Sequence, residues 1–346
     1  MPLNTEQLAN IYKFATDDFG KRKPVDQINI ERPLLTELLK SPDNYVGGPY
    51  FTDQLYVSNG DKGTGYSGYQ RLSFSEGRPV DQVKFRVGNY HLGRVISDDE
   101  LRKAGVKVTD DKGARADAGE TVVLTNMLTQ LMTQMDNACE EGLNESVWLD
   151  GSQDAELTPG VDALISLTPA VGTVGGVDAS VNTYWRNYAK TGIGSTLATV
   201  MDELELARRA IRRTGGRIGK IYAGADAIDI IRRAVIAANM TQVNYSSGAP
   251  LKIDLATDTL KFDGTPIEWV PEFDTNFGRA APTIPWSKRL YMMDMRHLKL
   301  ERDAANFRRV RYAGRPIDQL AYYFSNTSTF GLKTNKRNTH GVLAFA

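Results

Sequence analysis

Three histidines, His91, His297 and His340, are the residues best suited to acid–base or metal chemistry near neutral pH. Each stands alone, with no second histidine four residues away and no cysteine nearby. Metal centres need several such ligands at close spacing. The pattern therefore predicts ordinary strand or surface histidines, and no metal ion or cofactor is expected.

Two pairs of adjacent carboxylates, Asp98 with Asp99 and Asp110 with Asp111, are the next candidates. Adjacent residues point to different faces of a helix or strand, so these pairs are interpreted as helix caps or loops. Hydrolysis by paired carboxylates needs two groups roughly 5 to 9 Å apart across a cleft. Nothing in the sequence suggests that arrangement, and no catalytic residue is predicted.

The glycine-rich segment 172–176 and two basic segments are candidates for binding phosphates. The glycines lack the following Lys-Ser/Thr of a phosphate loop and the G-x-G-x-x-G spacing, so no phosphate loop is predicted. Arginines four residues apart share a helix face, and no aromatic series accompanies them for base stacking. Both basic segments are interpreted as solvated or subunit-facing surface rather than nucleic-acid sites. They comprise Arg208, Arg209, Arg212, Arg213, Arg217 and Lys220, and then Lys333, Lys336 and Arg337.

The composition is that of a globular protein with no net charge. Hydrophobic residues make up 41% of the 346 residues, and 42 basic side chains balance 42 acidic ones. A neutral chain does not collect nucleic acid or membrane over distance. The single cysteine, Cys139, is interpreted as a buried small hydrophobe in a reduced, cytoplasmic product. We find no signal pattern and no apolar run near the twenty residues of a membrane span, so no membrane contact is expected.

The elements that must position these residues are organised around a long helix predicted over 118–148. Its narrow apolar stripe steps by four and three through Leu124, Leu128, Leu131, Met135, Ala138 and Gly142. At 1.5 Å per residue such a helix is roughly 45 Å long, which exceeds a small domain. It is either a core helix of an ordinary α+β protein or a rod on which flatter elements lie.

A β-ribbon is predicted before this helix. Val83, Phe85 and Val87 alternate with polar residues, and the apolar set changes parity to Tyr90 and Leu92, which predicts a β-bulge. Residues 55–57 and 69–74 would lie opposite, with Gly60, Gly63, Gly65 and Gly68 in the connection. An isolated ribbon is marginal in water, so this one needs a surface to rest on. A neighbouring copy is the economical candidate, and an ordinary hairpin within a sheet is the alternative.

The remaining segments predict an α+β fold rather than a doubly wound sheet, because helices and strands follow without a regular βαβ rhythm. Short helices are expected over residues 8–15, before a basic turn at 21–24, and from Pro33 onward; Ser97 is expected to cap another. Residues 197–211 predict a helix, and the segment from Lys220 predicts a strand, a turn and a helix. A hairpin is predicted at residues 263–264, with strands at 290–295, 298–300 and 319–324 and a closing segment over 327–345.

The amino-acid sequences of several segments resemble those of the major capsid protein of tailed bacteriophages, which has the Hong Kong 97-type fold. These segments are GVDALI from Gly160, GTVGGVDASVNTYWRN from Gly172, KIYAGADAIDIIRRA from Lys220, TLKFDGTPIEWVPEFD from Thr259, RLYMMDMRHLKLERD from Arg289 and NKRNTHGVL from Asn335. The resemblance covers roughly residues 50–346. The segments are structural, so the resemblance brings no active site with it.

The resemblance implies a division of the chain into five parts. Residues 1–50 would be an N-terminal arm, and 51–97 an extended loop that lies over an adjacent subunit. Residues 98–194 would be a peripheral domain with its spine helix at 118–148, and 195–290 approximately an axial domain. Residues 291–346 would supply C-terminal strands that return to the peripheral domain.

The function implied is a shell of many copies, packed as pentamers and hexamers, that encloses a phage DNA genome after assembly in the host bacterial cytoplasm. Portal, scaffolding and decoration proteins are the other partners implied, with weak contact to packaged double-stranded DNA. A covalent crosslink from Lys62, the lysine near the ribbon tip, is a further possibility in this fold. The rival interpretations are an encapsulin-like nanocompartment shell and a soluble enzyme with a dispersed site.

Overall fold

The computed structural model describes residues 30–57, 65–69, 71, 80–103, 118–154, 156–237, 251–254, 259–314 and 319–346. Within this part of the chain, contacts define two compact units. Unit 1 takes residues 89–144 and 303–329, and unit 2 takes 31–88, 145–302 and 330–346. The helix expected at 8–15, the basic turn at 21–24, the pair Asp110 and Asp111, and Lys62 lie outside the described residues.

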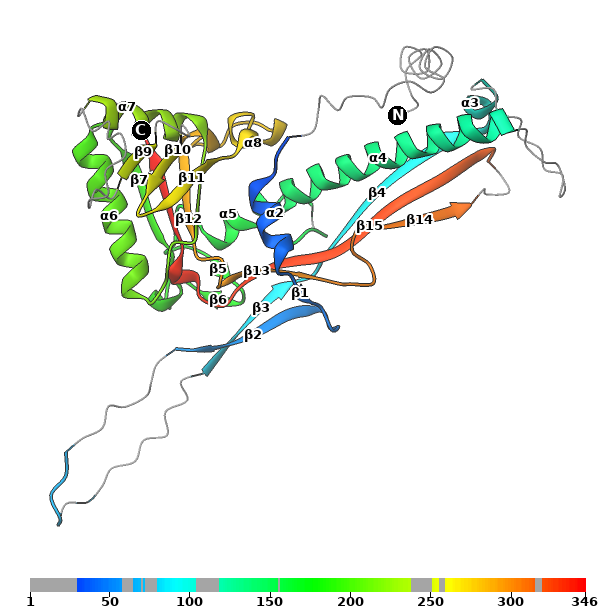
Figure 1. Ribbon diagram of the computed structural model, residues 1–346. Coiled ribbons are helices and arrows are strands. Elements are labelled where there is room, and N and C mark those ends of the chain that lie inside the picture. The colour runs from blue at the N-terminus through cyan, green and yellow to red at the C-terminus, as the bar shows by residue number, and fades with distance from the viewer. Residues whose placement is uncertain are drawn as a thin grey trace. The chain divides into compact units, whose positions relative to one another are not determined.

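A seven-stranded mixed sheet is the centre of unit 2 (Figure 1). Its strand order is β7-β16-β12-β8-β11-β10-β9, in which β16 pairs with β7 and β11 with β8 in parallel. The bounds are β7 Tyr188–Ile193, β8 Lys220–Ala223, β9 Leu251–Asp254, β10 Thr259–Phe262, β11 Thr265–Trp269, β12 Arg289–Met293 and β16 Gly341–Phe345.

Helices α6 (Leu197–Arg213) and α7 (Ala225–Ala237) share one hydrophobic core with this sheet. Successive strand side chains point to opposite faces, so alternate residues such as Ile221, Leu290 and Met292 belong to that core. The buried positions of α6 recur at steps of four and three, as an amphipathic helix requires. They are Val200, Leu204, Ala207 and Ile211.

On the opposite face of these strands, Tyr222 of β8 and Tyr291 of β12 join an aromatic cluster. Trp148 lies at its centre, with ring centroids 5.7 Å from Tyr222, 5.6 Å from Tyr291 and 4.7 Å from Phe273. Phe273 comes from the short helix α8 (Pro271–Asp274). Aromatic pairs at this spacing and near right angles stabilise beyond their buried area. Both faces of the central strands are therefore covered within unit 2.

Smaller pieces of unit 2 surround a second set of strands. Strand β13 (Leu298–Arg302) pairs with the end of β15 (Ala321–Thr334) and, on its other side, with β1 (Asp43–Asn44). Helix α2 (Pro33–Lys40) begins at the expected proline and buries Leu34, Leu35 and Leu38. The remaining short elements are α5 (Val161–Leu164), β5 (Thr173–Val174), β6 (Val177–Asp178), η1 (Thr183–Trp185), η2 (Asn276–Gly278), η3 (Trp286–Lys288) and η4 (Arg337–Thr339).

Strand pairing places the segment 291–346, expected to form one part of the chain, in two different sheets. Strands β12 and β16 belong to the seven-stranded sheet with β8 and β11, whereas β13 and β15 pair elsewhere. The cause lies in the side chains of β16. All five of its residues are buried, so the strand needs cover on both faces, which a central place in the larger sheet provides.

Unit 1 is a long helix on a three-stranded set. Helix α4 spans Ala118–Trp148, as the sequence predicts, and its residues up to 144 belong to this unit. Strands β4 (Gly88–Ser97) and β14 (Arg309–Gly314) both pair with the first part of β15. Helix α3 (Asp98–Lys103) starts with the expected cap: Ser97 and Glu100 exchange hydrogen bonds between side chain and backbone amide in both directions.

The described part of the α4 stripe faces the sheet of unit 1. Met135 and Cys139 are buried, which confirms the interpretation of Cys139 as a small core residue. A Cβ on Gly142 would collide with the Tyr90 ring, so the stripe ends in glycine for lack of space. On the same helix, Asp136 and Glu140 lie four residues apart and both pair with Arg308, at 2.7 and 2.6 Å.

The predicted β-bulge near Gly88 is wrong. The parity does change there, since Val83 and Phe85 are buried before it and Ile96 after it. The change arises because the strand ends: β3 (Val80–Arg86) pairs with β2 (Tyr50–Tyr56), and a separate strand, β4, begins at Gly88. A Cβ on Gly88 would lie 2.8 Å from the Thr158 backbone nitrogen, which explains the glycine at this junction.

Two local predictions in unit 2 are confirmed. Asp263 and Gly264 connect β10 to β11 with φ angles of 50° and 80°, as a tight hairpin turn requires. The segment from Lys220 forms β8, a one-residue turn at Gly224 and α7. A Cβ on Gly224 would collide with the backbone of Ser287, so the close approach of this turn to the segment before β12 depends on glycine.

Replacing Gly224 by alanine is therefore expected to lower the free energy of unfolding by roughly 2 kcal/mol or more, as overpacking does. Gly194→Ala is the matched control, because its new Cβ would lie 3.5 Å from the Thr199 hydroxyl, an ordinary contact. Urea denaturation of both variants checks this expectation. Equal stability of the two variants would contradict it.

Candidate assembly surfaces

The β2–β3 ribbon has one buried face and one exposed face. Its strands are antiparallel and in register from Tyr50 opposite Arg86 to Tyr56 opposite Val80. Side chains alternate with period two, so Phe51, Leu55, Val83 and Phe85 share the inner face, all at most 6% exposed. The ribbon predicted from sequence is confirmed over these two strands. Residues 69 and 71 lie in no strand, and the rest of 69–74 is outside the described residues.

Glycines let the inner face of the ribbon pack closely on unit 2. A Cβ on Gly331 of β15 would collide with the Phe51 ring, and one on Gly175 would lie 3.0 Å from the Phe85 ring. Gly175 is in the β5–β6 turn, at φ 63°, and its carbonyl accepts the Lys84 N–H at 2.8 Å. The glycine-rich segment 172–176 therefore supports the ribbon. No single-sequence motif identified this role, since it depends on contact with residues ninety positions earlier.

Lys333 ties the ribbon to the strands beneath it. Its ammonium lies 2.9 Å from Glu301, 3.2 Å from Asp43 and 3.8 Å from Asp53 of β2, and the side chain is 15% exposed. Burial alone would lower the pKa of Lys333, but the hydrogen bond to Glu301 and the charges of Asp53 and Asp43 outweigh it and raise the pKa. The lysine therefore stays charged. It lies among carboxylates within unit 2, whereas the sequence predicted a solvated or subunit-facing residue.

Among the residues of unit 2 that the structure describes, none buries the outer face of the ribbon. Tyr56 is 81% exposed and lies opposite Val80, which is 48% exposed; Tyr50 at the other end is 50% exposed. Tyr56 and Val80 thus form an adjacent pair at one end, with exposed polar residues between them and Tyr50. Adjacent exposed apolar side chains mark an interaction surface more often than single ones do. Residues Tyr50, Tyr56 and Val80 define what we call the outer ribbon face.

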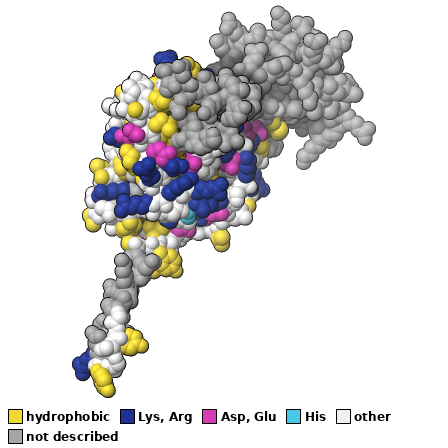
Figure 2. Space-filling view, turned by 60° about the vertical axis from the view of Figure 1, so that its left-hand side comes forward, with side chains coloured by type: hydrophobic (Ala, Val, Ile, Leu, Met, Phe, Trp, Pro, Cys, Tyr) yellow, Lys and Arg dark blue, Asp and Glu magenta, His cyan; other side chains and the backbone are white. Residues whose placement is uncertain are grey.

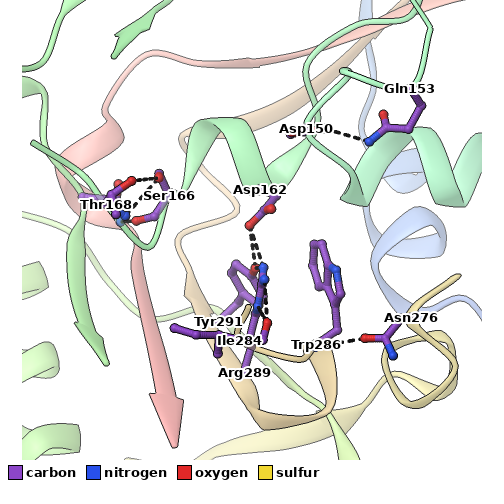
Figure 3. Close-up of polar contacts among 11 residues, drawn as sticks. Asp150, Gln153, Asp162, Ser166, Thr168, Asn276, Ile284, Trp286, Arg289 and Tyr291 are labelled. Atoms are coloured by element: carbon purple, nitrogen blue, oxygen red, sulfur yellow. Dashed lines mark hydrogen bonds and ion pairs between the residues drawn. The ribbon is translucent and has the colours of Figure 1, made fainter. Parts of the chain in front are cut away.

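A polar cluster lies around Asp162, whose side chain is 26% exposed (Figure 3). Asp162 of α5 points toward Arg289 and Tyr291 of β12, accepting hydrogen bonds of 2.9 Å and 3.1 Å from them. Two other guanidinium nitrogens of Arg289 donate to the Ile284 carbonyl, at 3.1 and 2.8 Å, and the guanidinium carbon lies 4.4 Å from the centre of the Trp286 ring. Burial raises the pKa of Asp162, although Arg289 and Tyr291 act against it.

Every member of this cluster is committed to a fixed partner. The arginine is 4% exposed, and the ion pair joins α5 to the aromatic cluster around Trp148. A buried pair that satisfies its donors in this way holds two elements together, and removing one partner is costly. The segment GVDALI thus contributes a structural joint.

Arg337, in the second basic segment, is not at the surface as the sequence predicted. It is fully buried, and its guanidinium donates to the carbonyls of Leu164, at 2.6 Å, and Trp185, at 3.1 Å. Burial lowers its pKa to about 10, so it remains charged at neutral pH. The carbonyl of Leu164 ends α5, where a cation is favoured. Sequence patterns place arginine outside, and here the carbonyl groups of two distant turns hold it inside.

The histidines lie in three different settings. His91 is exposed on β4, and His297 is half-buried with its Nδ1 2.7 Å from the Asn335 side chain. His340 is fully buried, unlike the surface or strand position expected, and its Nδ1 accepts the Asp294 N–H at 3.2 Å. In the part of the chain that is described, no three His, Cys, Asp or Glu side chains come close enough to hold a metal ion.

The first basic segment is partly paired. Arg208 and Arg212 of α6 both reach Asp263, and Lys220 pairs with Glu268 at 2.6 Å. Arg209 is 74% exposed beside Glu205, and Arg213 and Arg217 are exposed. The prediction of a solvated helix face is thus confirmed for Arg209 and Arg213; Arg217 is solvated in the loop after α6, and the prediction is incomplete for the others.

In the described part of the chain, no helix combines the length and apolar character needed to cross a bilayer. A hollow in unit 1 between α4 and the sheet is about 10 Å³, roughly the room that one water needs.

No protein-family model matches the chain, and no curated protein matches it in sequence. Solved structures do match, over nearly the whole chain. The capsid of cyanophage A-1(L) aligns at a TM-score of 0.63 with 15% identity, over 95% of this chain and 97% of that one. The capsid of cyanophage P-SCSP1u aligns at 0.54 with 12% identity, over 95% and 91%.

An encapsulin, SrpI from Synechococcus elongatus, aligns at a TM-score of 0.50 with 9% identity, over 94% of this chain and 91% of that one. At these identities the similarity concerns the fold, which the chain shares with the capsid structures over almost its full length.

The contact of Gly175 with the ribbon can be tested by comparing alanine substitutions at Gly175 and at the adjacent Gly176. Gly175 and Gly176 both have positive φ, 63° and 82°, so alanine strains the backbone at either position. Only the Cβ at position 175 meets the ribbon, while that at 176 meets nothing within 4 Å. Gly175→Ala is therefore expected to increase amide hydrogen exchange in β2 and β3 beyond the level seen for Gly176→Ala. Equal exchange in the two variants would show that the contact is unimportant.

Burial of His340 predicts a pH dependence of stability. Burial outweighs the charge of Asp294 and lowers the pKa of His340 to about 3, from a usual 6.5. Its contribution is complete above pH 6.5 and is lost as the pH falls toward 3, because the unfolded chain takes up the proton first. About 2 kcal/mol should be lost between pH 6.5 and 5.

Urea denaturation across this pH range measures the loss. His340→Gln should remove that component of the pH dependence, whereas His91→Gln, at an exposed position, should keep it. An unchanged pH profile in His340→Gln would refute the assignment.

Proposed function

We propose that this chain, which has the fold of phage capsid proteins, is the major capsid protein of a tailed bacteriophage and has a structural rather than an enzymatic role. Copies of the chain would assemble as pentamers and hexamers into an icosahedral shell that encloses the DNA genome. The single observation that carries the proposal is structural similarity over about 95% of the chain to a cyanophage capsid, at a TM-score of 0.63.

The ribbon is the element best suited to join copies. Its inner face is fixed to unit 2 by Phe51, Phe85 and Lys333, so its strands are already ordered before any contact. Its outer face leaves Tyr56 and Val80 exposed. A preformed strand pair loses little conformational freedom on binding, which favours association. In the shell, the outer ribbon face would lie against an adjacent subunit.

The Hong Kong 97-type division of the chain is part of the same proposal. Residues 1–50 would be the N-terminal arm, 51–97 the extended loop, 98–194 the peripheral domain and 195–290 the axial domain. Helix α4 would be the spine helix. Because β16 pairs with β12 and β7 in one sheet, two boundaries change: β7 (188–193) and 341–345 would belong with the axial strands, and β13 and β15 with the peripheral ones.

Other partners follow from the proposed role. A closed DNA-containing shell requires a portal, and scaffolding or decoration proteins would assist assembly. Contact with packaged double-stranded DNA would be weak. Assembly would take place in the cytoplasm of the host bacterium, and the product would be the virion capsid.

An encapsulin-like nanocompartment is the second candidate, because the SrpI encapsulin shares the fold. The lower TM-score, 0.50 against 0.63, favours the phage capsid. Electron microscopy of the purified full-length protein tests the common claim, which requires closed shells, tubes or rings. Nuclease-protected DNA inside particles would support the capsid, and packaged enzyme without DNA would support the nanocompartment. A strictly monomeric protein, even with phage scaffold present, would contradict both.

Removing the apolar side chains of the outer ribbon face should impair assembly without unfolding the subunit. Tyr56→Ser combined with Val80→Ser changes exposed positions, so the free energy of unfolding should shift by no more than about 0.5 kcal/mol. Burying one such side chain at an interface contributes roughly 1.5–3 kcal/mol. The concentration needed for particles should therefore rise at least about tenfold.

Light scattering against protein concentration measures this threshold. Val171→Ser combined with Val181→Ser is the matched control, since both are exposed valines of unit 2 outside the ribbon, at 70% and 75%. An unchanged threshold in the ribbon variant would exclude the outer ribbon face from the contact.

A further inference from the structure

Three loops of unit 2 meet beyond the C-terminal end of α6: residues 214–219, 294–297 and 335–340. Backbone and side-chain hydrogen bonds hold them together. The Thr214 hydroxyl donates to the Asn338 carbonyl at 3.0 Å, and the Asn335 N–H donates to the His297 carbonyl at 3.3 Å. The Gly219 N–H donates to the Met293 carbonyl at 2.9 Å. The loops therefore present their side chains from a fixed backbone.

Four cations lie on this surface. Arg213 at the end of α6 and Arg217 are exposed, the Arg296 side chain is 58% exposed, and Lys336 is partly exposed. The Lys336 ammonium lies 3.3 Å from the position a Cβ would take on Gly215, which places it beside the first loop. Figure 2 shows Lys and Arg side chains gathered in a band across the side that carries α6. We call Arg213, Arg217, Arg296 and Lys336 the α6 basic patch.

The carboxylate of these loops, Asp294, balances the charge of Arg296 from a buried position. It is 1% exposed and accepts the Arg217 N–H at 2.8 Å and two guanidinium nitrogens of Arg296, at 2.9 and 2.6 Å. Burial acts to raise its pKa, but these hydrogen bonds outweigh it and lower the pKa to about 2. Asp294 therefore orients Arg296 from beneath.

The remaining cations differ from their neighbours on α6. Arg208 and Arg212 are paired with Asp263. Within the described part of the chain, by contrast, no carboxylate pairs with the side chains of Arg213, Arg217 or Lys336. In a protein of zero net charge, this surface therefore carries a local excess of positive charge that no described carboxylate balances.

The composition of the surface favours a phosphate backbone over a protein as its partner. Protein interfaces have an apolar or aromatic centre within a polar rim. None of the large exposed hydrophobic side chains lies in these three loops, and the loops contain no aromatic residue besides histidine. Arginine presents a planar fork that matches phosphate oxygens, and such contacts need no apolar surface.

We propose that the α6 basic patch binds the phosphodiester backbone of double-stranded DNA, without regard to base sequence, and thereby forms a contact between shell and genome. The choice of DNA as the polyanion rests on the proposed capsid function. Without side chains that stack on bases, the patch neutralises phosphates alone, and the contact is weak and strongly salt-dependent.

Fluorescence anisotropy of a labelled duplex of about 30 base pairs, titrated with the full-length protein between about 50 and 200 mM NaCl, tests the proposal. The protein is kept below the concentration at which particles appear. The test variant is Arg213→Gln with Arg217→Gln. The matched control is Arg209→Gln with Arg233→Gln, which removes the same charge from exposed arginines of α6 and α7, 74% and 81% exposed.

The test variant should bind more weakly, and the slope of log affinity against log salt should fall by about two, one for each lost phosphate contact. The control should keep the wild-type slope, and a second duplex of unrelated sequence should give the same values. Equal losses in both variants would overturn the proposal, since binding would then follow net charge alone. So would an unchanged slope in the test variant, or a patch-dependent affinity for polyglutamate that DNA does not compete.

Electron microscopy of the same samples separates this proposal from the proposed function. Shells that form normally from wild-type protein, together with no patch-dependent DNA binding, would overturn the DNA contact alone. Patch-dependent DNA binding by a protein that never assembles would uphold the contact and count against the capsid.

Discussion

The β2–β3 ribbon depends on a surface to lie on, because two strands alone bury too little to be stable in water. Unit 2 supplies that surface for one face only. Gly331 and Gly175 let the Phe51 and Phe85 rings approach the backbone, and Lys333 gathers the carboxylates of Asp43, Asp53 and Glu301 beneath the strands. On the opposite face Tyr56 and Val80 are exposed. Under the proposed function, a second copy would cover this face and extend the packing that holds the ribbon in place.

The buried charges of unit 2 serve the same purpose at other joints. Arg289 with Asp162 fastens α5 to β12, and Arg337 fastens the last turn before β16 to the carbonyls of Leu164 and Trp185. Each joins segments that lie more than a hundred residues apart in the chain. Such joints are fixed, because a buried charge cannot leave its partners without a large cost in desolvation.

Periodicity predicted the elements whose side chains face one core. Helix α4, the hairpin at Asp263 and Gly264, and the strand-turn-helix from Lys220 follow from local spacing and turn chemistry. What sequence could not provide was contact at long range. The parity change at Gly88 reflects a new strand rather than a bulge, and β16 joined the larger sheet because all five of its residues need cover. Burial of Arg337 and His340 likewise depends on distant partners, the Leu164 carbonyl and the Asp294 N–H.

The most direct test of the central claim is amide hydrogen exchange of the full-length protein, compared between unassembled subunits and purified particles. If a second copy covers the outer ribbon face, amides of β2 and β3 should become more protected in particles, because opening the ribbon would also break the contact between copies. Amides of β8 and β12, which are already buried within unit 2, should change little. Equal protection of the ribbon in both states would contradict the claim that the ribbon joins neighbouring subunits.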